Sequence, residues 1–232
     1  MQLPDSSPKD PFEESFLETL RKSDLADIVQ DVAELGLDSL LVNGPFRDLP
    51  LIGSIVASGK TVAAIRDWFL LRKVAKFLQR LASVPLEERR SMADQIKEDK
   101  GYGQRIAESI VVYLDRYDHL NKAELLSRMF IAYTRGELQR EEFIRLASAI
   151  DTAFIHDLEL INQYYSLEDP DQVDLGDTKR TVFNSGLSSF YVLTHHEWRR
   201  SGAEHPQVYH FNQLAMKFAK AALGDSFHGD RW

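Results

Sequence analysis

Cationic side chains are concentrated in one segment of the chain, and their chemistry is that of a docking surface for negative charge. Residues 49–81 carry six lysines and arginines and one acidic residue, whereas residues 1–48 carry eleven acidic and four basic residues. Apolar spacing predicts an amphipathic helix from Lys60 to Ala82. The predicted contacts for a protein partner or an anionic membrane surface are its cations and two aromatic residues: Lys60, Arg66, Trp68, Phe69, Arg72, Lys73, Lys76 and Arg80.

The same segment also fits a central helix of the core. Its predicted inward face is formed by apolar residues at helical spacing, namely Ile65, Trp68, Phe69, Leu71, Ala75, Leu78 and Leu81. The lysine and arginine stems would then pack over neighbouring helices and pair with the acidic N-terminal residues. The preceding run 49–59, LPLIGSIVASG, would enter the core or insert shallowly into a membrane. In both interpretations the cations face outward.

A glycine-rich stretch makes nucleotide binding a further alternative. A Walker A loop reads GxxxxGK[ST], because its backbone N–H groups cradle phosphates while Lys and Ser/Thr reach phosphate and magnesium. Here five residues, not four, separate Gly53 from Gly59-Lys60-Thr61, and the run 110–115 imitates a Walker B strand. That run has helical spacing, however, and no strands alternate with helices as a parallel sheet requires. The pattern therefore favours helices here over a P-loop.

Other reactive side chains form no catalytic or metal-binding pattern. Five of the seven histidines fall in residues 195–228, but without an HExxH spacing. An EF-hand counted from Asp169 fails at its sixth and twelfth positions. The chain has no cysteine, which excludes disulfides and thiolate chemistry, and no GxSxG motif. We therefore expect no metal and no cofactor, and the sequence favours a non-enzymatic protein.

The C-terminal region has a different pattern from the rest. Residues 189–198 and 207–211 are aromatic and β-branched and are separated by a turn, which predicts a hairpin. A short helix precedes the hairpin and a final helix follows it, which is the layout of a winged helix. A DNA-binding regulator is thus an alternative function, with phosphate contacts from Lys179, Arg180, Arg199 and Arg200. The net charge of −8 argues against general nucleic-acid binding.

These elements predict a mainly α fold, with a multi-helix body and a small C-terminal α+β module built on the winged-helix-like hairpin. The expected order is an arm at 1–11, a helical body at 12–165, an acidic linker loop at 166–178, the helix–hairpin–helix module at 179–224 and a tail at 225–232.

Within the predicted body, Asn121 opens a helix that Gly136 ends, and the next helix runs from Gln139 to about Tyr165. The acidic N-terminus lacks a signal-peptide core, and no run of 18 uncharged apolar residues exists. We therefore expect a cytoplasmic protein, with peripheral attachment to the inner membrane left open.

The order of the parts resembles that of a bacterial family. The resemblance rests on the layout of DLPLIGSIVASGKTVAAIRDWFLLRKVAKFLQRL, YLDRYDHLNKAELLSRMFIAYTRGELQREEFIRLASAID and YHFNQLAMKFAKAAL. It is similar to uncharacterised helical proteins of the abortive-infection alpha type, which are associated with phage defence. The likeness covers about residues 35–224 and includes no diagnostic motif, so no site residue is carried over. It implies a bacterial effector in defence or stress response, and self-association stays open.

Overall fold

The computed structural model describes residues 11–35, 44–57, 65–98, 106–155, 158, 191–192, 210–211 and 213–223. Over these residues the protein is mainly helical, as the sequence predicts. The chain divides into two compact units, Met1–Arg116 and Tyr117–Trp232. This division falls inside the predicted helical body, and the sequence analysis did not anticipate it.

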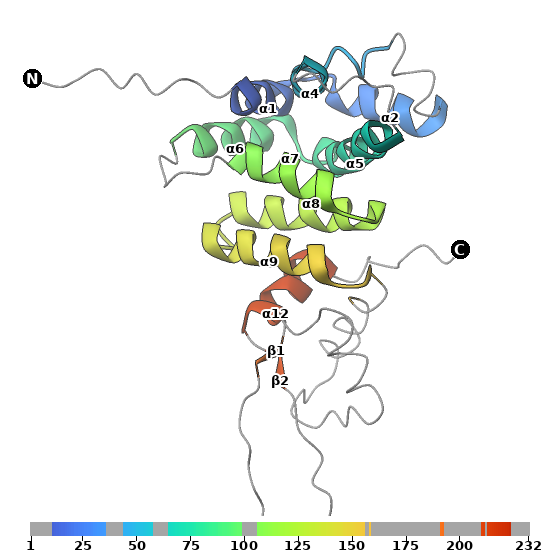
Figure 1. Ribbon diagram of the computed structural model, residues 1–232. Helices are drawn as coiled ribbons and strands as arrows, with labels where there is room; N and C mark the ends of the chain where they lie inside the picture. Colours follow the sequence, from blue (N-terminus) through green and yellow to red (C-terminus); the bar gives the residue numbers. More distant parts are fainter. Residues whose placement is uncertain are drawn as a thin grey trace, which may run out of the picture. The chain divides into compact units, whose positions relative to one another are not determined.

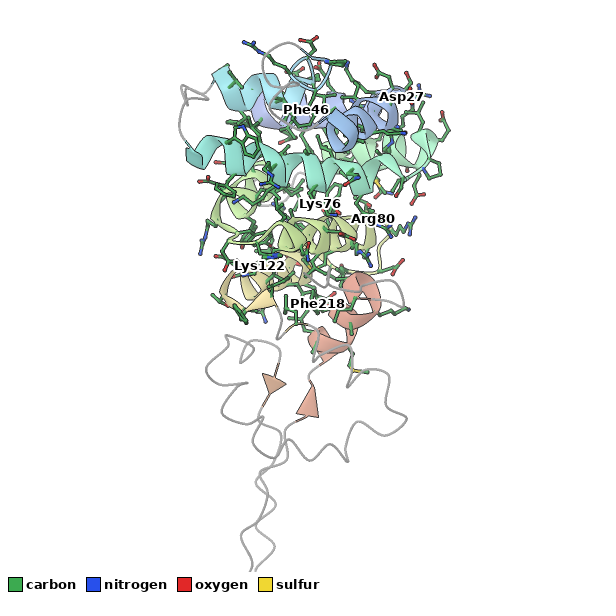
Figure 2. All side chains as sticks on the ribbon, turned by 90° about the vertical axis from the view of Figure 1, so that its right-hand side faces the viewer. Asp27, Phe46, Lys76, Arg80, Lys122 and Phe218 are labelled. Carbon is green, nitrogen blue, oxygen red and sulfur yellow. The ribbon has the colours of Figure 1, made fainter. Side chains whose placement is uncertain are left out.

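Unit 1 is a group of packed helices. They are α1 (Pro11–Arg21), α2 (Leu25–Leu35), α4 (Pro50–Ala57), α5 (Ile65–Ala82), α6 (Leu86–Glu98) and α7 (Ile106–Arg116). Helix α1 packs against α4, α6 and α7, while α5 packs against α2 and α7 (Figure 1). Three phenylalanines are fully buried in the unit: Phe16 and Phe77, whose ring centroids lie 6.3 Å apart, and Phe46, labelled in Figure 2. Their burial, with that of the surrounding leucines and isoleucines, supplies most of the driving force for packing.

Helix α4 depends on α1 for its first hydrogen bond. Pro50 suits the first turn because it needs no hydrogen-bond acceptor there. The next backbone N–H, of Leu51, donates to Thr19 Oγ1 at 3.1 Å, and this hydroxyl donates to the Ser15 carbonyl at 2.8 Å. The hydroxyls of Ser15 and Ser54 share a further hydrogen bond. Leu51, Ile52 and Ile55 of α4 are buried in unit 1, as is Leu49 before it, so the larger apolar side chains in the described part of the run 49–59 mostly belong to the core.

A buried guanidinium holds the C-terminus of α1. Arg89 on α6 is only 3% exposed, and its Nη1 donates to the carbonyls of Leu20 at 2.9 Å and Lys22 at 2.8 Å. Its Nε donates to the Val84 carbonyl at 3.2 Å. Carbonyls in the last turn of a helix have no partner within that helix, so the arginine satisfies groups that would otherwise be buried alone. Desolvation, followed by repulsion from Arg90, lowers the pKa of Arg89.

Unit 2 is built around α8 (Leu120–Thr134), which packs against α9 (Arg140–Thr152). The chain returns through α12 (Gln213–Phe218) and the π-helix η3 (Ala219–Leu223), which contact α9 and α8 respectively (Figure 1). The Phe143 ring packs edge-on to Phe130, with centroids 6.3 Å apart, and stacks on Tyr133 at 5.6 Å. The Phe218 side chain is fully buried in the same unit.

The connection between α8 and α9 agrees with the sequence analysis. Gly136 has a φ of 77°, a backbone conformation that side chains with a Cβ rarely adopt, and it follows the C-cap residue Arg135. The N–H of Gly136 donates to the Tyr133 carbonyl at 3.0 Å. Helix α9 then starts with Glu142 Oε2 accepting the Gln139 N–H at 2.9 Å. The predicted stop at Gly136 is confirmed.

Two predicted helix ends in unit 2 are wrong. The N-cap of α8 is His119, whose Nδ1 accepts the Asn121 N–H at 3.1 Å, so Asn121 lies inside the helix. The expected helix to about Tyr165 ends at Thr152 instead, because Ala153 has an extended backbone with a ψ of 146°. Apolar spacing continues past this point, and spacing alone does not reveal a local change of backbone conformation.

The described part of the predicted C-terminal module is small. Strand β1 (Tyr191–Val192) pairs antiparallel with β2 (His210–Phe211), so that Tyr191 lies opposite Phe211. The final helix is present as α12 and η3. Residues 1–10 of the predicted arm, the loop 166–178, the tail and the remainder of the predicted helix and hairpin lie outside the described residues, and Pro11, the last residue of the arm, begins α1. The α+β, winged-helix-like character of this module therefore stays a prediction.

Replacing Arg89 with methionine keeps most of the volume and removes the donors to three carbonyls. We expect the free energy of unfolding to fall by about 3 kcal/mol, because each buried acceptor left without a donor costs roughly 1–3 kcal/mol. The control is Arg90→Met, since Arg90 is 49% exposed and pairs with Glu87 at the surface, so its change should stay within about 0.5 kcal/mol. Urea denaturation followed by circular dichroism compares the two, and equal losses would contradict the capping role.

The pairing of Glu142 with Lys217, at 2.6 Å, makes the docking of α12 on α9 sensitive to acid. Hydrogen bonds from Lys217 and from the Gln139 N–H lower the pKa of Glu142. A carboxyl with a lowered folded pKa stabilises the fold above its unfolded pKa of about 4.3, and this stabilisation is lost as pH falls through the folded value. The stability of wild type should thus exceed that of Glu142→Gln at neutral pH and converge with it below about pH 4. Denaturation across pH tests this, with exposed Glu141→Gln as control.

Candidate functional site

The predicted basic helix forms as α5, and its apolar face is in the core. Of the residues expected to face inward, Leu71, Ala75, Leu78 and Leu81 are buried, and Leu70, Val74 and Phe77 join them. The core interpretation of this helix is therefore confirmed. Arg66 belongs to its first turn, and Lys60 lies outside the described residues.

Phe69 faces outward, against the prediction that it shares the inward face. Its side chain is 51% exposed. At 3.6 residues per turn, Phe69, Arg72, Lys76 and Arg80 fall within about a quarter turn of one another, opposite the centre of the buried face. The buried face of α5 is thus narrower than the apolar residues of its sequence predict. We call these four residues the basic stripe.

The basic stripe combines cations with an aromatic pair. Arg80 is exposed, and Arg72 and Lys76 are half-buried. The guanidinium carbon of Arg72 lies over the ring of half-buried Trp68, 5.2 Å from its centroid, which is within the range of a cation–π interaction. Figure 2 labels Lys76 and Arg80 along α5. An ordered arginine beside an exposed phenylalanine is an arrangement suited to binding rather than to catalysis.

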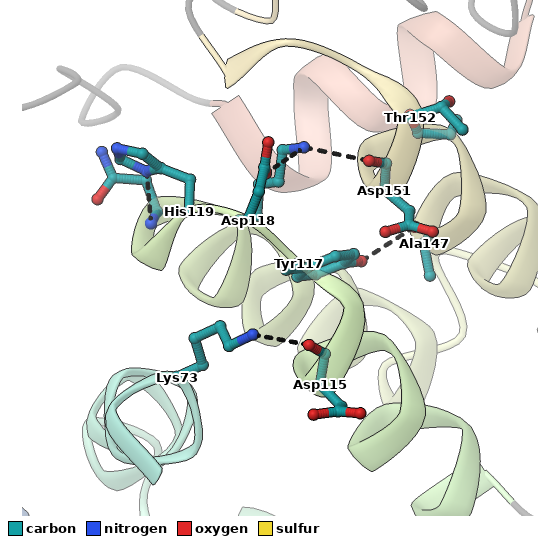
Figure 3. A network of polar contacts seen from close by, with 11 residues as sticks. Lys73, Asp115, Tyr117, Asp118, His119, Ala147, Asp151 and Thr152 are labelled. Carbon is teal, nitrogen blue, oxygen red and sulfur yellow. Dashed lines mark hydrogen bonds and ion pairs between the residues drawn. The ribbon is translucent and has the colours of Figure 1, made fainter. Parts of the chain in front are cut away.

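Lys73 does not belong to this surface, and its predicted role as a partner contact is wrong. The side chain is 6% exposed, and Nζ donates to the Asp115 carbonyl at 3.0 Å (Figure 3). Asp115 lies in the last turn of α7, where carbonyls lack helical partners and the helix dipole attracts cations. An amphipathic pattern does not distinguish a lysine that faces water from one that reaches the end of a neighbouring helix.

Two cations of unit 2 have the same role, and sequence reasoning missed both. Lys122, only 1% exposed, donates to the Asp151 carbonyl in the last turn of α9 at 3.2 Å and pairs with Asp118 at 2.7 Å. Arg128 donates to the Ala222 carbonyl in η3 at 3.2 Å. The only sequence signal was a cation among apolar residues on a helix, which also describes many surface positions.

The alternative sites are not assembled by the described residues. Gly53 lies within α4 and the run 110–115 lies within α7, so neither has the loop or strand that a P-loop needs. Lys179, Arg180, Arg199 and Arg200, the predicted DNA contacts, lie outside the described residues. Among residues that are described, no group of three or more histidine and carboxylate side chains is placed to hold a metal ion. Nor is any helix in those ranges long and apolar enough to span a bilayer.

No protein-family model, curated protein or solved structure matches the chain. The candidate site therefore rests on the geometry of α5, and the resemblance to abortive-infection proteins stays a prediction.

The contrast between Lys73 and Arg80 gives a direct test of which cation is structural. We expect Lys73→Met to lower the free energy of unfolding by about 2 kcal/mol, because it leaves the Asp115 carbonyl without its charged donor. Arg80→Met on the same helix should change it by less than about 0.5 kcal/mol. Urea denaturation of both variants measures the difference. If Lys73→Met leaves the free energy of unfolding unchanged, Lys73 has no structural role and belongs with the surface cations of α5.

Proposed function

We propose that this protein is a non-enzymatic interaction protein that binds another protein through the basic stripe of α5. The exposure of Phe69 supports the proposal most, because it sets an aromatic side chain among cations on a helix whose other face is fully used in the core. A role as an effector in bacterial defence or stress response belongs to the same proposal and rests on the layout of the sequence.

A protein partner is favoured over a membrane by the way α5 is packed. An interfacial helix lays a broad apolar face into the headgroup region. On α5 that face, including Leu70, Val74 and Phe77, is in the core of unit 1. Among the α5 side chains whose burial is described, from Trp68 to Ala82, a narrow cationic strip remains outside with one strongly exposed apolar side chain, Phe69. This strip offers little area to lipid.

The composition of the stripe fits the centre of a protein interface. Aromatic residues and arginine are enriched among the residues that dominate binding energy, whereas lysine is depleted. Stacking on Trp68 already restricts Arg72, so this side chain loses less conformational freedom when a partner binds. The charge of the stripe selects a partner with carboxylates opposite it.

Photo-cross-linking tests the proposal in cells that produce the protein naturally. With a benzoylphenylalanine at position 69, we expect one discrete protein adduct, identified by mass spectrometry. Charge reversal by Arg72→Glu with Arg80→Glu should weaken the adduct at least about tenfold, because it opposes the partner's carboxylates. The control position is Phe154, which is 55% exposed in unit 2 and should not give this adduct.

Two results would reject protein docking at this surface. One is the absence of an adduct at position 69, and the other is an adduct that charge reversal leaves unchanged. If the protein floats with anionic vesicles and the same charge reversal abolishes this flotation, the basic stripe binds a membrane instead of a protein. Lys73→Glu is unsuitable for either assay, because Lys73 supports the end of α7.

A further inference from the structure

The basic stripe is a row of side chains that runs along one side of α5. Arg72 and Arg80 are eight residues apart, which places them about 12 Å apart along the helix axis. Phe69 precedes Arg72 by three residues, or about 4.5 Å. Figure 2 labels Lys76, between the two arginines, on the same side of α5 as Arg80. A partner that contacts the whole stripe must therefore follow α5 for about 16 Å.

From this spacing we propose that the part of the partner that binds the basic stripe is an α-helix with carboxylates about eight residues apart. Two carboxylates at that spacing on a helix are also about 12 Å apart along its axis, so they match Arg72 and Arg80. The inference rests on the proposed docking role of the basic stripe and names the structure and the charge of the segment that occupies it.

A helical segment fits this surface better than an extended one. An extended peptide gains much of its affinity by adding a strand to the edge of a sheet. The described residues of unit 1 form helices and turns but no strand, so they offer no such edge. A helix has already paired its own backbone groups and binds through side chains alone. Ridges of side chains on two helices fit into each other's grooves, and a crossing angle of about 20° keeps them in contact over several turns.

Apolar and charged contacts are separated along the stripe. Phe69, 51% exposed, is at its N-terminal end, and the two arginines follow toward the C-terminus. The partner helix is therefore expected to carry an apolar side chain opposite Phe69 and its carboxylates beyond that point. Removal of the phenylalanine from water favours binding, and each guanidinium can donate two parallel hydrogen bonds to one carboxylate. The charge pairs set the register of the two helices.

Cross-linking from two positions on α5 tests whether the bound segment is helical. Benzoylphenylalanine replaces Phe69 in one variant and exposed Gln79 in another, which leaves the cations of the stripe intact. These positions are 10 residues, or about 15 Å, apart along the axis. Both should capture the same partner, at residues about ten apart in its sequence. An extended chain covers the distance in about five residues, because each advances about 3.3 Å.

A synthetic peptide with the sequence of the captured segment tests its conformation directly. Fluorescence anisotropy measures its binding to the full chain. Proline at the midpoint of the peptide should weaken binding at least about tenfold, because proline removes a helical hydrogen bond and clashes with the preceding turn. Alanine at the same place preserves the helix and should stay within about twofold of the unchanged peptide.

Charge exchange tests the pairing with the two arginines. Lysines in place of the two matching carboxylates of the peptide should weaken its binding to wild type at least about tenfold. The same peptide should recover binding to the variant Arg72→Glu with Arg80→Glu, because opposite charges then face each other again. Damage to the fold of the variant does not produce that recovery.

The matched control for cross-linking is Gln95 on α6, an exposed glutamine outside the stripe, which should not capture this partner. The helical partner is overturned by captured residues five or fewer apart, by no capture at Gln79, by equal binding of the proline and alanine peptides, or by no recovery on charge exchange. In each of these cases the docking role of the stripe stands, provided that Phe69 captures a protein. If position 69 captures none, both proposals fail.

Discussion

Four cationic side chains that the fold removes from water each end on carbonyl groups at the C-terminus of another helix. Arg89 supports α1, Lys73 supports α7, Lys122 supports α9 and Arg128 supports η3. Burying a cation is costly unless polar groups replace its hydration, and the last carbonyls of a helix are unpaired groups at the negative end of its dipole. Each contact thus replaces the lost hydration of a buried cation and gives unpaired helix carbonyls a donor. Each of these contacts lies within one unit.

This constraint also determines which part of α5 is available for binding. Lys73 is buried and supports α7, whereas Arg72 is half-buried and Arg80 is exposed. Lys73 and Arg80 are seven residues apart and so point in nearly the same direction, within about 20°. The contact with the end of α7, and not the angular position on α5, therefore separates the structural cation from the surface cation. The net basic character of residues 49–81 therefore overstates the charge that a partner meets.

Most helices could be predicted from the sequence, because burial repeats with the helical period and caps have strong residue preferences. The pattern from Leu25 to Leu35 and the glycine at 136 are examples in which local signals agree with the fold. The failures share a cause. The end of α9 at Thr152, the His119 cap and the direction of Lys73 are all set by local backbone conformation or by a neighbouring helix, neither of which a one-dimensional pattern contains.

The candidate site was predictable in its location and not in its details. Charge segregation indicated α5, the helix that carries the basic stripe. The exposure of Phe69 did not follow from its apolar side chain, and the stacking of Arg72 on Trp68 requires knowledge of side-chain placement. The division at Arg116 had no composition signal at all, since the surrounding sequence is helical on both sides.

The hydroxyl of Thr19 has a consequence for the order in which the chain folds. Helix α4 has eight residues, too few to persist alone in water, and its first N–H after Pro50 is satisfied from α1. α4 therefore becomes stable only after α1 has formed beside it. Since α1 precedes it in the chain, it leaves the ribosome first, and the direction of synthesis matches the direction in which this part of the protein assembles.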